Sequence, residues 1–248
     1  MRFFLLFFTI FFWSFELLAQ VDLGRTAIYS NDWTTSIFVH NRGMGGKLNF
    51  SKRINTSIWR QLNIEFLNMK HPKEFKVRSL GFNNASGSYT YGKLNSLYLL
   101  RLGFGLKRNL SSKFYKNTLG ISAYVNAGTA LGILKPVYLE VFYPSPDQST
   151  GIFVTERYDP IKHNVQSNIF SNASFSRGLD ELELRVGTYI KGGFIFNFSD
   201  YNNYIKAIEV GNSIDFFTKN IPIMALVENK QVFSTVYIAI SFGSKWNK

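Results

Sequence analysis

The chain has 248 residues, of which 46% are hydrophobic and 18% charged, and its formal net charge at pH 7 is +12. The absence of cysteine excludes disulfides, thiolate catalysis and an acylated lipoprotein cysteine. No apolar run beyond the N-terminus reaches the length of a membrane-spanning helix, which excludes an α-helical membrane protein. The basic residues are scattered and form no single stripe, so the net charge does not predict nucleic-acid binding.

The first residues have the pattern of an export signal. Arg2 precedes an apolar run over residues 3–13, and a cleavage site follows at Ala19. An N-terminal anchor helix is the alternative, but the run is only about half of the ~20 residues that a span requires. We therefore expect residues 1–19 to be a signal peptide and residues 20–248 to form one exported domain.

Residues 96–108 alternate with a period of two. One set of alternate side chains is bulky and apolar, and the other set is small or charged, in the orders Tyr98, Leu100, Leu102, Phe104, Leu106 and Leu99, Arg101, Gly103, Gly105, Lys107. A transmembrane barrel turns the apolar face toward lipid and the polar face toward its lumen. A soluble barrel or sandwich, which hides the apolar face in a core, is the alternative.

The same alternation predicts further strands along the chain. Asn31 and Asp32 are expected to form the turn of a first hairpin, and the Gly- and Lys-rich residues 41–55 have no clear register. The expected strands are residues 23–30, 33–40, 58–69, 89–108, 119–131, 185–198, 208–216 and 232–242. These segments predict an all-β fold, an antiparallel up-and-down transmembrane β-barrel of about eight strands.

The lengths of the connections support this fold. Long connections at 70–88, 135–168 and 218–230 alternate with short ones at 109–116 and 199–203, as extracellular loops alternate with periplasmic turns in outer-membrane barrels. The inward faces are rich in glycine, as the narrow interior of a small barrel requires, whereas a soluble core would be filled with larger side chains. Together these patterns predict a monomer in the outer membrane, in contact with outer-membrane lipid.

Four short strings, in this order along a barrel pattern, resemble a family of outer-membrane β-barrel proteins from the Bacteroidota. They are His71-Pro72-Lys73-Glu74, Gly92-Lys93-Leu94-Asn95, Leu134-Lys135-Pro136-Val137-Tyr138 and Ile221-Pro222-Ile223-Met224-Ala225. The resemblance spans most of the mature chain and implies the fold and the location. The family carries no established activity, so the resemblance assigns no functional residue and no cofactor.

Several charged residues are expected on the inward faces of the strands. One interpretation is a narrow, selective channel; the other is a filled lumen in which the charges pair, because an unpaired buried charge is very costly. About eight strands leave an interior that side chains can fill, which favours the second interpretation. The candidate lumen charges are Glu65, Arg101, Lys107, Lys191, Glu209 and Asp215.

The long loops are the candidate contact surfaces. Aromatic loops interrupted by proline bind partners, or fold over the barrel mouth as a lid. The expected partner is a surface protein or a glycan. The candidate contact residues are His71, Glu74, Tyr138, Tyr143 and Tyr158, and the apolar segment 221–225 is expected either to dock under the mouth or to meet a partner.

The chain carries no nucleophile motif and too few histidines for an evident metal site. A lipid-modifying enzyme with a histidine and a serine near the membrane interface is a further alternative, with His40 near Ser36, or His71 near Ser86 or Ser88. His71 and Glu74 form a possible pair of metal ligands, but a site needs three or four. A structural or recognition role at the cell surface is the favoured interpretation.

Overall fold

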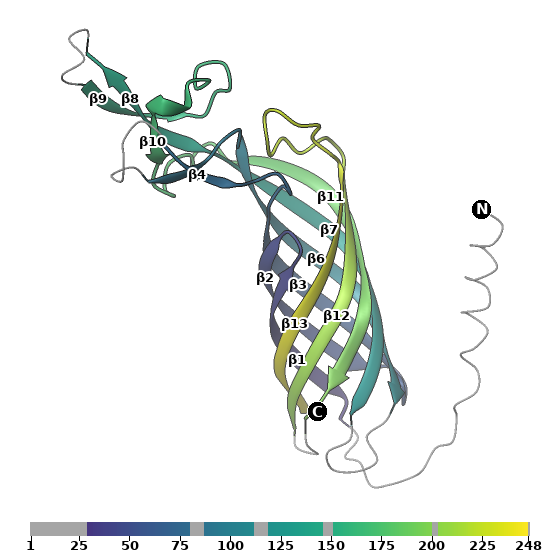
Figure 1. Ribbon diagram of the computed structural model, residues 1–248. Coiled ribbons are helices and arrows are strands. Elements are labelled where there is room, and N and C mark those ends of the chain that lie inside the picture. The colour runs from purple at the N-terminus through teal and green to yellow at the C-terminus, as the bar shows by residue number, and fades with distance from the viewer. Residues whose placement is uncertain (1–28, 80–86, 112–118, 146–150, 200–202, 248) are drawn as a thin grey trace, which may run out of the picture.

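The computed structural model describes residues 29–79, 87–111, 119–145, 151–199 and 203–247. Eight antiparallel strands close into a barrel in the order β1-β13-β12-β11-β7-β6-β3-β2 (Figure 1). Barrel strands that follow one another in the chain are therefore neighbours in the wall. This confirms the predicted fold class. The barrel strands are β1 (Asn31–His40), β2 (Gly43–Arg53), β3 (Ile58–Met69), β6 (Asn95–Ser111), β7 (Gly120–Pro136), β11 (Glu183–Asn197), β12 (Tyr204–Phe217) and β13 (Val232–Trp246).

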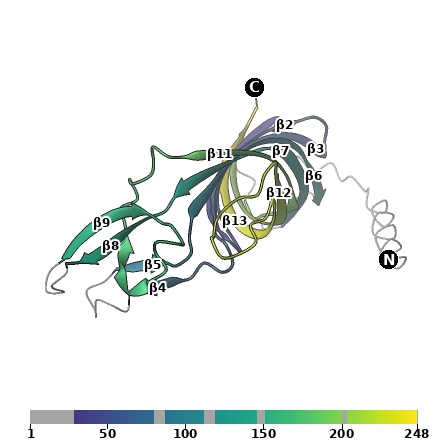
Figure 2. The ribbon, with the colours of Figure 1, turned by 90° about the horizontal axis from the view of Figure 1, so that it is seen from above.

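Five short strands and one turn of 3-10 helix form a lobe at the end of the barrel away from the described termini. The lobe comprises the described parts of residues 70–94 and 137–182 and leans to one side of the barrel axis (Figure 2). One sheet has the order β10-β8-β9, and the other pairs β4 with β5. The elements are β4 (Lys76–Arg78), β5 (Ser88–Thr90), β8 (Tyr138–Pro144), β9 (Gly151–Arg157), η3 (Gln166–Asn168) and β10 (Ile169–Asn172).

The first predicted hairpin is wrong. Asn31 and Asp32 are not a turn but the start of β1, which pairs with β2 and turns at residues 41–42. Most of the predicted strand 23–30 lies outside the described residues. The unassigned segment 41–55 holds β2, whose glycines at 43, 45 and 46 conceal its alternation.

Two loop boundaries also need correction. Residues 135–136 belong to β7, and the connection that follows extends to residue 182 and contains β8, β9 and β10. The predicted strand 89–108 is two elements, β5 and β6, because the chain turns at Gly92, whose φ of 76° is in the left-handed region that favours glycine.

Two rows of residues, each made of register partners on neighbouring strands, explain how tyrosine side chains fit inside so narrow a barrel. Tyr189 on β11 reaches across Gly128 and Gly103 and donates a hydrogen bond of 2.5 Å to Asn63 Oδ1 on β3. A second row places Tyr237 on β13 beside Gly211 and Gly193, with Tyr124 at its far end. The paired glycines leave the space that each tyrosine ring occupies.

The outward faces of all eight barrel strands carry large exposed apolar side chains. Examples are Ile37, 74% exposed on β1, Phe104, 65% exposed on β6, and Ile240, 57% exposed on β13. We call these outward side chains the belt. In the part of the chain that the structure describes, no helix is long and apolar enough to cross a membrane.

Candidate functional site: the lumen and the lobe

The middle of the lumen holds a network of buried ion pairs. Arg101 donates to Asp215 through two nitrogens, at 2.8 and 2.6 Å, and to Glu65 at 3.1 Å. Lys191 Nζ lies 2.6 Å from the other oxygen of Glu65. All four side chains are at most 1% exposed, and their charges sum to zero. Each charge therefore has an opposite partner, as expected for charges buried inside the barrel.

A second group of charges lies beside this network. Lys47 forms an ion pair with Glu209, and the hydroxyls of Tyr124 and Tyr237 donate to the other carboxylate oxygen of Glu209. Nearer the end where the described termini lie, Lys107 Nζ is 2.7 Å from Asp32 Oδ2. The structure therefore brings all six candidate lumen charges inside the barrel, each with a partner.

Two partners in the lumen are not among the predicted lumen charges. Asp32 lies in the predicted turn, and Lys47 lies in the segment without a clear register. The signal for Lys47 was present in residues 47–51, where Lys47, Asn49 and Ser51 alternate with Leu48 and Phe50. Its burial beside Glu209 shows that this alternation marks an inward face.

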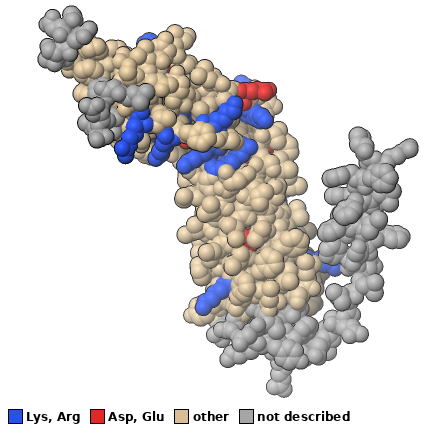
Figure 3. All heavy atoms as spheres, in the orientation of Figure 1, with Lys and Arg blue, Asp and Glu red and all other residues tan. Residues whose placement is uncertain are grey.

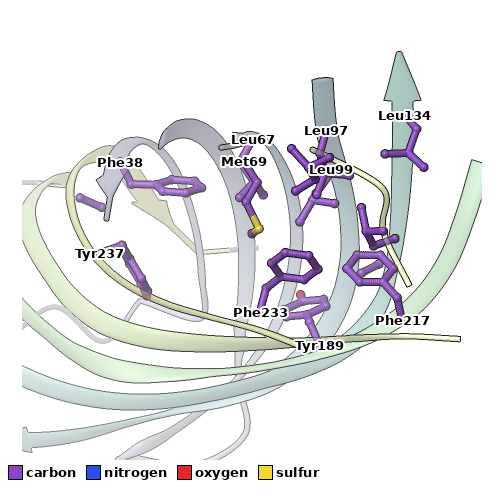
Figure 4. Close-up of a cluster of buried hydrophobic side chains, with 14 of the residues drawn as sticks. Phe38, Leu67, Met69, Leu97, Leu99, Leu134, Tyr189, Phe217, Phe233 and Tyr237 are labelled. Carbon is purple, nitrogen blue, oxygen red and sulfur yellow. The ribbon is translucent and has the colours of Figure 1, made fainter. Parts of the chain in front are cut away.

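A cluster of buried apolar side chains lies inside the barrel wall (Figure 4), and we call the part that the connection between β12 and β13 contributes to it the plug. Ile221, Ile223 and Met224 from the connection between β12 and β13 are at most 6% exposed. They pack against side chains from the barrel wall, including Leu67, Leu97, Leu99, Leu134, Phe217 and Phe233. The segment 221–225, which the sequence left with two possible roles, docks under the mouth.

The same connection fastens the lobe to the barrel. The backbone N–H of Leu94 donates to Ile223 O at 2.9 Å, and that of Ala225 donates to Gly92 O at 2.8 Å. The side-chain amide of Asn95 donates to Pro222 O at 2.8 Å. Two backbone hydrogen bonds and one side-chain hydrogen bond thus join residues 92–95, where the lobe meets β6, to the plug.

Removing the plug should loosen this connection without unfolding the barrel. Replacing both Ile221 and Ile223 with alanine removes two buried side chains, each at a cost of about 2–5 kcal/mol. We expect trypsin to cut faster at Lys219 or Lys230, which are exposed in the same connection. Limited proteolysis of the folded protein in detergent measures the rate. Leu226→Ala, at a site 69% exposed, is the matched control and should leave the rate unchanged.

The lobe has a small apolar core of its own. Tyr89, Leu139, Val141, Tyr158 and Ile169 are each at most 4% exposed. Burial raises the pKa of the Tyr158 hydroxyl, and its ring stacks on His163 with centroids 5.8 Å apart. The structure therefore places Tyr158, a candidate contact residue, inside the lobe rather than on its surface.

The other candidate contact residues lie nearer the surface. Tyr138 donates to Glu181 at 2.6 Å, an interaction that raises the pKa of the phenol, and Tyr143 donates to Glu156 at 3.3 Å. Glu74 forms an ion pair with Lys93 rather than with its neighbour His71. Desolvation and the nearby Arg42 and Lys73 lower the pKa of His71, which therefore favours the neutral ring.

In the suggested pair of His40 and Ser36, each side chain has another partner. His40 accepts a hydrogen bond at Nδ1 from the backbone of Arg42, and its Nε2 lies 3.1 Å from Asn68 O. Ser36 shares a hydrogen bond of 2.7 Å with Ser241. Ser86 lies outside the described residues. Among the residues that the structure describes, no group of three His, Asp or Glu side chains is placed to hold a metal ion.

Comparison with known proteins finds no matching family model and no matching curated protein. Three solved structures have similar folds. The attachment invasion locus protein Ail of Yersinia pestis, solved with the heparin analogue sucrose octasulfate, is 8% identical, with 88% of this chain and all of that chain covered and a TM-score of 0.41. Neisserial surface protein A is 8% identical, with 88% of this chain and 97% of that chain covered and a TM-score of 0.38.

The third is the N-terminal β-barrel domain of OprF from Pseudomonas aeruginosa. It is 8% identical over 87% of this chain and 97% of that domain, with a TM-score of 0.36. At such low identities and scores, we take no functional role from these proteins.

Proposed function

We propose that this chain is a monomeric integral outer-membrane protein with a filled lumen, which presents its lobe at the cell surface to bind a partner protein. The belt supports the membrane location, because soluble monomers rarely expose an apolar surface that continues around the whole molecule. The export signal at residues 1–19, with cleavage near Ala19, remains a prediction, since these residues lie outside the described part. Membership of the Bacteroidota family that the sequence resembles is likewise part of this proposal.

The direction of the barrel follows from its connections. At the end that carries the lobe, three of the four connections are long, at 70–94, 137–182 and 218–231, and the fourth is the two-residue turn at 41–42. The connections at the other end, 54–57, 112–119 and 198–203, are all shorter than these three. Outer-membrane barrels have long extracellular loops and short periplasmic turns. This arrangement supports an extracellular lobe.

The observation that carries the recognition role is the lobe itself. It has a separate core, and β9 forms an edge of its three-stranded sheet, with Ile152 66% exposed on it. An exposed edge strand offers backbone groups and side chains to a strand of another protein. A channel is less well supported, because the ion pairs and the plug occupy the lumen.

Excision of the lobe sheet tests this role. The backbone N–H of Ala173 donates to Tyr138 O at 2.9 Å, so residues 139–172 can be replaced with an Asn-Gly turn without separating the two ends. We expect the variant to keep a barrel that migrates differently on a gel before and after boiling. Cells that display it should lose adhesion to a panel of immobilised surface proteins that the full chain binds.

A second variant and a second measurement separate the alternatives. Ile152→Lys places a charge on the edge strand and should reduce the same adhesion while the lobe stays folded. Equal adhesion of all three proteins would contradict the recognition role. Stepwise conductance of the full chain in planar bilayers would instead favour a channel.

A further inference from the structure

Charge is distributed unequally between the two segments that build the lobe. Residues 70–94 contain five basic side chains and one acidic side chain, whereas residues 137–182 contain three basic and six acidic. The five bases are Lys70, Lys73, Lys76, Arg78 and Lys93. Because both segments belong to one lobe, one part of its surface is strongly basic.

The basic segment begins close to the belt, at a level that Phe175 of the acidic segment also reaches, with its ring edge-on to Tyr98 and the centroids 6.4 Å apart. Lys70 directly follows Met69, the last residue of β3. Four residues earlier, the exposed ring of Phe66 stacks on Tyr98 of the neighbouring strand, with centroids 6.1 Å apart, as in the aromatic girdle of a membrane barrel. At about 3.3 Å per strand residue, Lys70 lies only ~13 Å along the strand from this girdle.

The lobe overhangs the barrel wall on this side. In Figure 1, β4 lies along the lower edge of the lobe, the edge nearer the belt, and Figure 3 shows Lys and Arg side chains gathered there. Lys76 and Arg78 are alternate residues of β4 and therefore project on the same side of the strand. This edge faces the level at which the headgroups of the surrounding lipid would lie.

Among the described residues, four bases of residues 70–78 have no acidic partner. Lys70, Lys73, Lys76 and Arg78 are exposed and form no ion pair among the described residues. The single acid of the segment, Glu74, is bound to Lys93. Phe75, 70% exposed, lies between Lys73 and Lys76. Exposed bases around an exposed aromatic ring are typical of a surface that meets a membrane interface.

We propose that residues 70–78 form a foot by which the lobe rests on the phosphate-bearing headgroups of the lipids around the barrel. The bases contact phosphates, and the ring of Phe75 enters the interface between headgroups and acyl chains. The acidic segment 137–182 is repelled by the same surface, so β9 is kept turned away from it. This inference rests on the membrane location proposed above but not on the partner that the lobe binds.

An environment-sensitive fluorophore on the lobe tests the contact. The chain contains no cysteine, so Ser88→Cys gives a single labelling site. Ser88 is exposed on β5 and pairs with Arg78, so the probe lies beside the foot without replacing a base. The labelled full chain is placed in nanodiscs of phosphatidylcholine alone or of phosphatidylcholine mixed with phosphatidylglycerol. Thr155→Cys on β9, exposed on the other sheet, is the control probe.

In the anionic nanodiscs, we expect the fluorescence emission of the Ser88 probe to shift to shorter wavelength and its intensity to rise by at least about twofold. The shift should become smaller as added salt screens the contact. Changing Lys70, Lys73, Lys76 and Arg78 together to glutamine should abolish the response. The matched control changes Arg157, Lys162 and Arg177 to glutamine and should keep it. Because all the changed side chains are exposed, both variants should keep the gel shift of the folded barrel. The pair Lys76→Gln and Arg78→Gln serves if the fourfold variant does not fold.

Three results would overturn the proposal. The first is the same emission from the Ser88 probe in both lipid mixtures. The second is an equal response from the Thr155 probe, which would report a general effect of anionic lipid on the lobe. The third is a shift with added heparin in phosphatidylcholine nanodiscs but none with phosphatidylglycerol, which would assign the foot to a soluble polyanion. If the unaltered chain shows no change in gel migration on boiling, that result would instead contradict the membrane barrel itself.

Discussion

Replacing Arg101 with methionine should destabilise the barrel by about 3–5 kcal/mol, because it leaves Glu65 and Asp215 buried with too little positive charge. Arg101 is the only base that pairs with Asp215 among the described residues, and it shares Glu65 with Lys191. The free energy of unfolding can be measured in urea, with the folded fraction followed on unboiled gels. Arg60→Met, at an exposed site on the same face of the sheet as the belt, should change it by less than about 0.5 kcal/mol.

A double variant shows whether the cost is electrostatic. Changing Arg101 to methionine and Asp215 to asparagine together removes one charge of each sign and leaves the pair of Lys191 and Glu65 intact. We expect most of the lost stability to return, because the remaining lumen charges balance again. A double variant as unstable as Arg101→Met alone would show that packing of the guanidinium, and not its charge, supports the lumen.

Gly128→Val should prevent the barrel from closing and thus has the largest expected effect of any single substitution considered. A side chain at Gly128 would collide with the backbone oxygen of Leu102 and lie 2.5 Å from the Cα of Gly103. It would also occupy the space over which Tyr189 reaches Asn63. We expect refolding in detergent to yield no band that shifts on boiling.

Gly192→Val is the matched control for this substitution. Gly192 lies on β11 with its face turned outward, and a Cβ there would come no closer than 3.4 Å to another heavy atom. This variant should fold normally, since valine suits both a strand and an apolar exterior. Folding of both variants would contradict the proposed role of the glycine rows.

Periodicity made the barrel predictable from sequence, but it did not determine which residues meet inside. Alternation separates inward from outward side chains and so identified Arg101, Lys191 and Asp215 as facing the lumen. Their pairing depends on the register of strands far apart in the chain, which alternation does not specify. Alternation also predicts that the glycines face inward. Which tyrosine lies over which glycine depends on the register.

The errors have specific physical causes. Asn31 and Asp32 carry a strong turn signal, but burial of Asp32 beside Lys107 determines its place in a strand. Glycines conceal the alternation of β2, and the lobe sheet was missed because prolines at 144 and 160 flank its short strands. The overhang of the foot depends on how the lobe leans, which is a tertiary property.

The seam between β1 and β13 determines when the wall can be completed. Ser36 and Ser241, which share a hydrogen bond across this seam, are 205 residues apart in the chain. The other strands of the wall pair with a neighbour in chain order, so a growing ribbon can assemble step by step as an open, curved sheet with two exposed edges. Those edges can join only after the last strand has arrived, and contacts between such distant segments form slowly. Until then, two unpaired edges and an unfinished belt must be kept away from other chains.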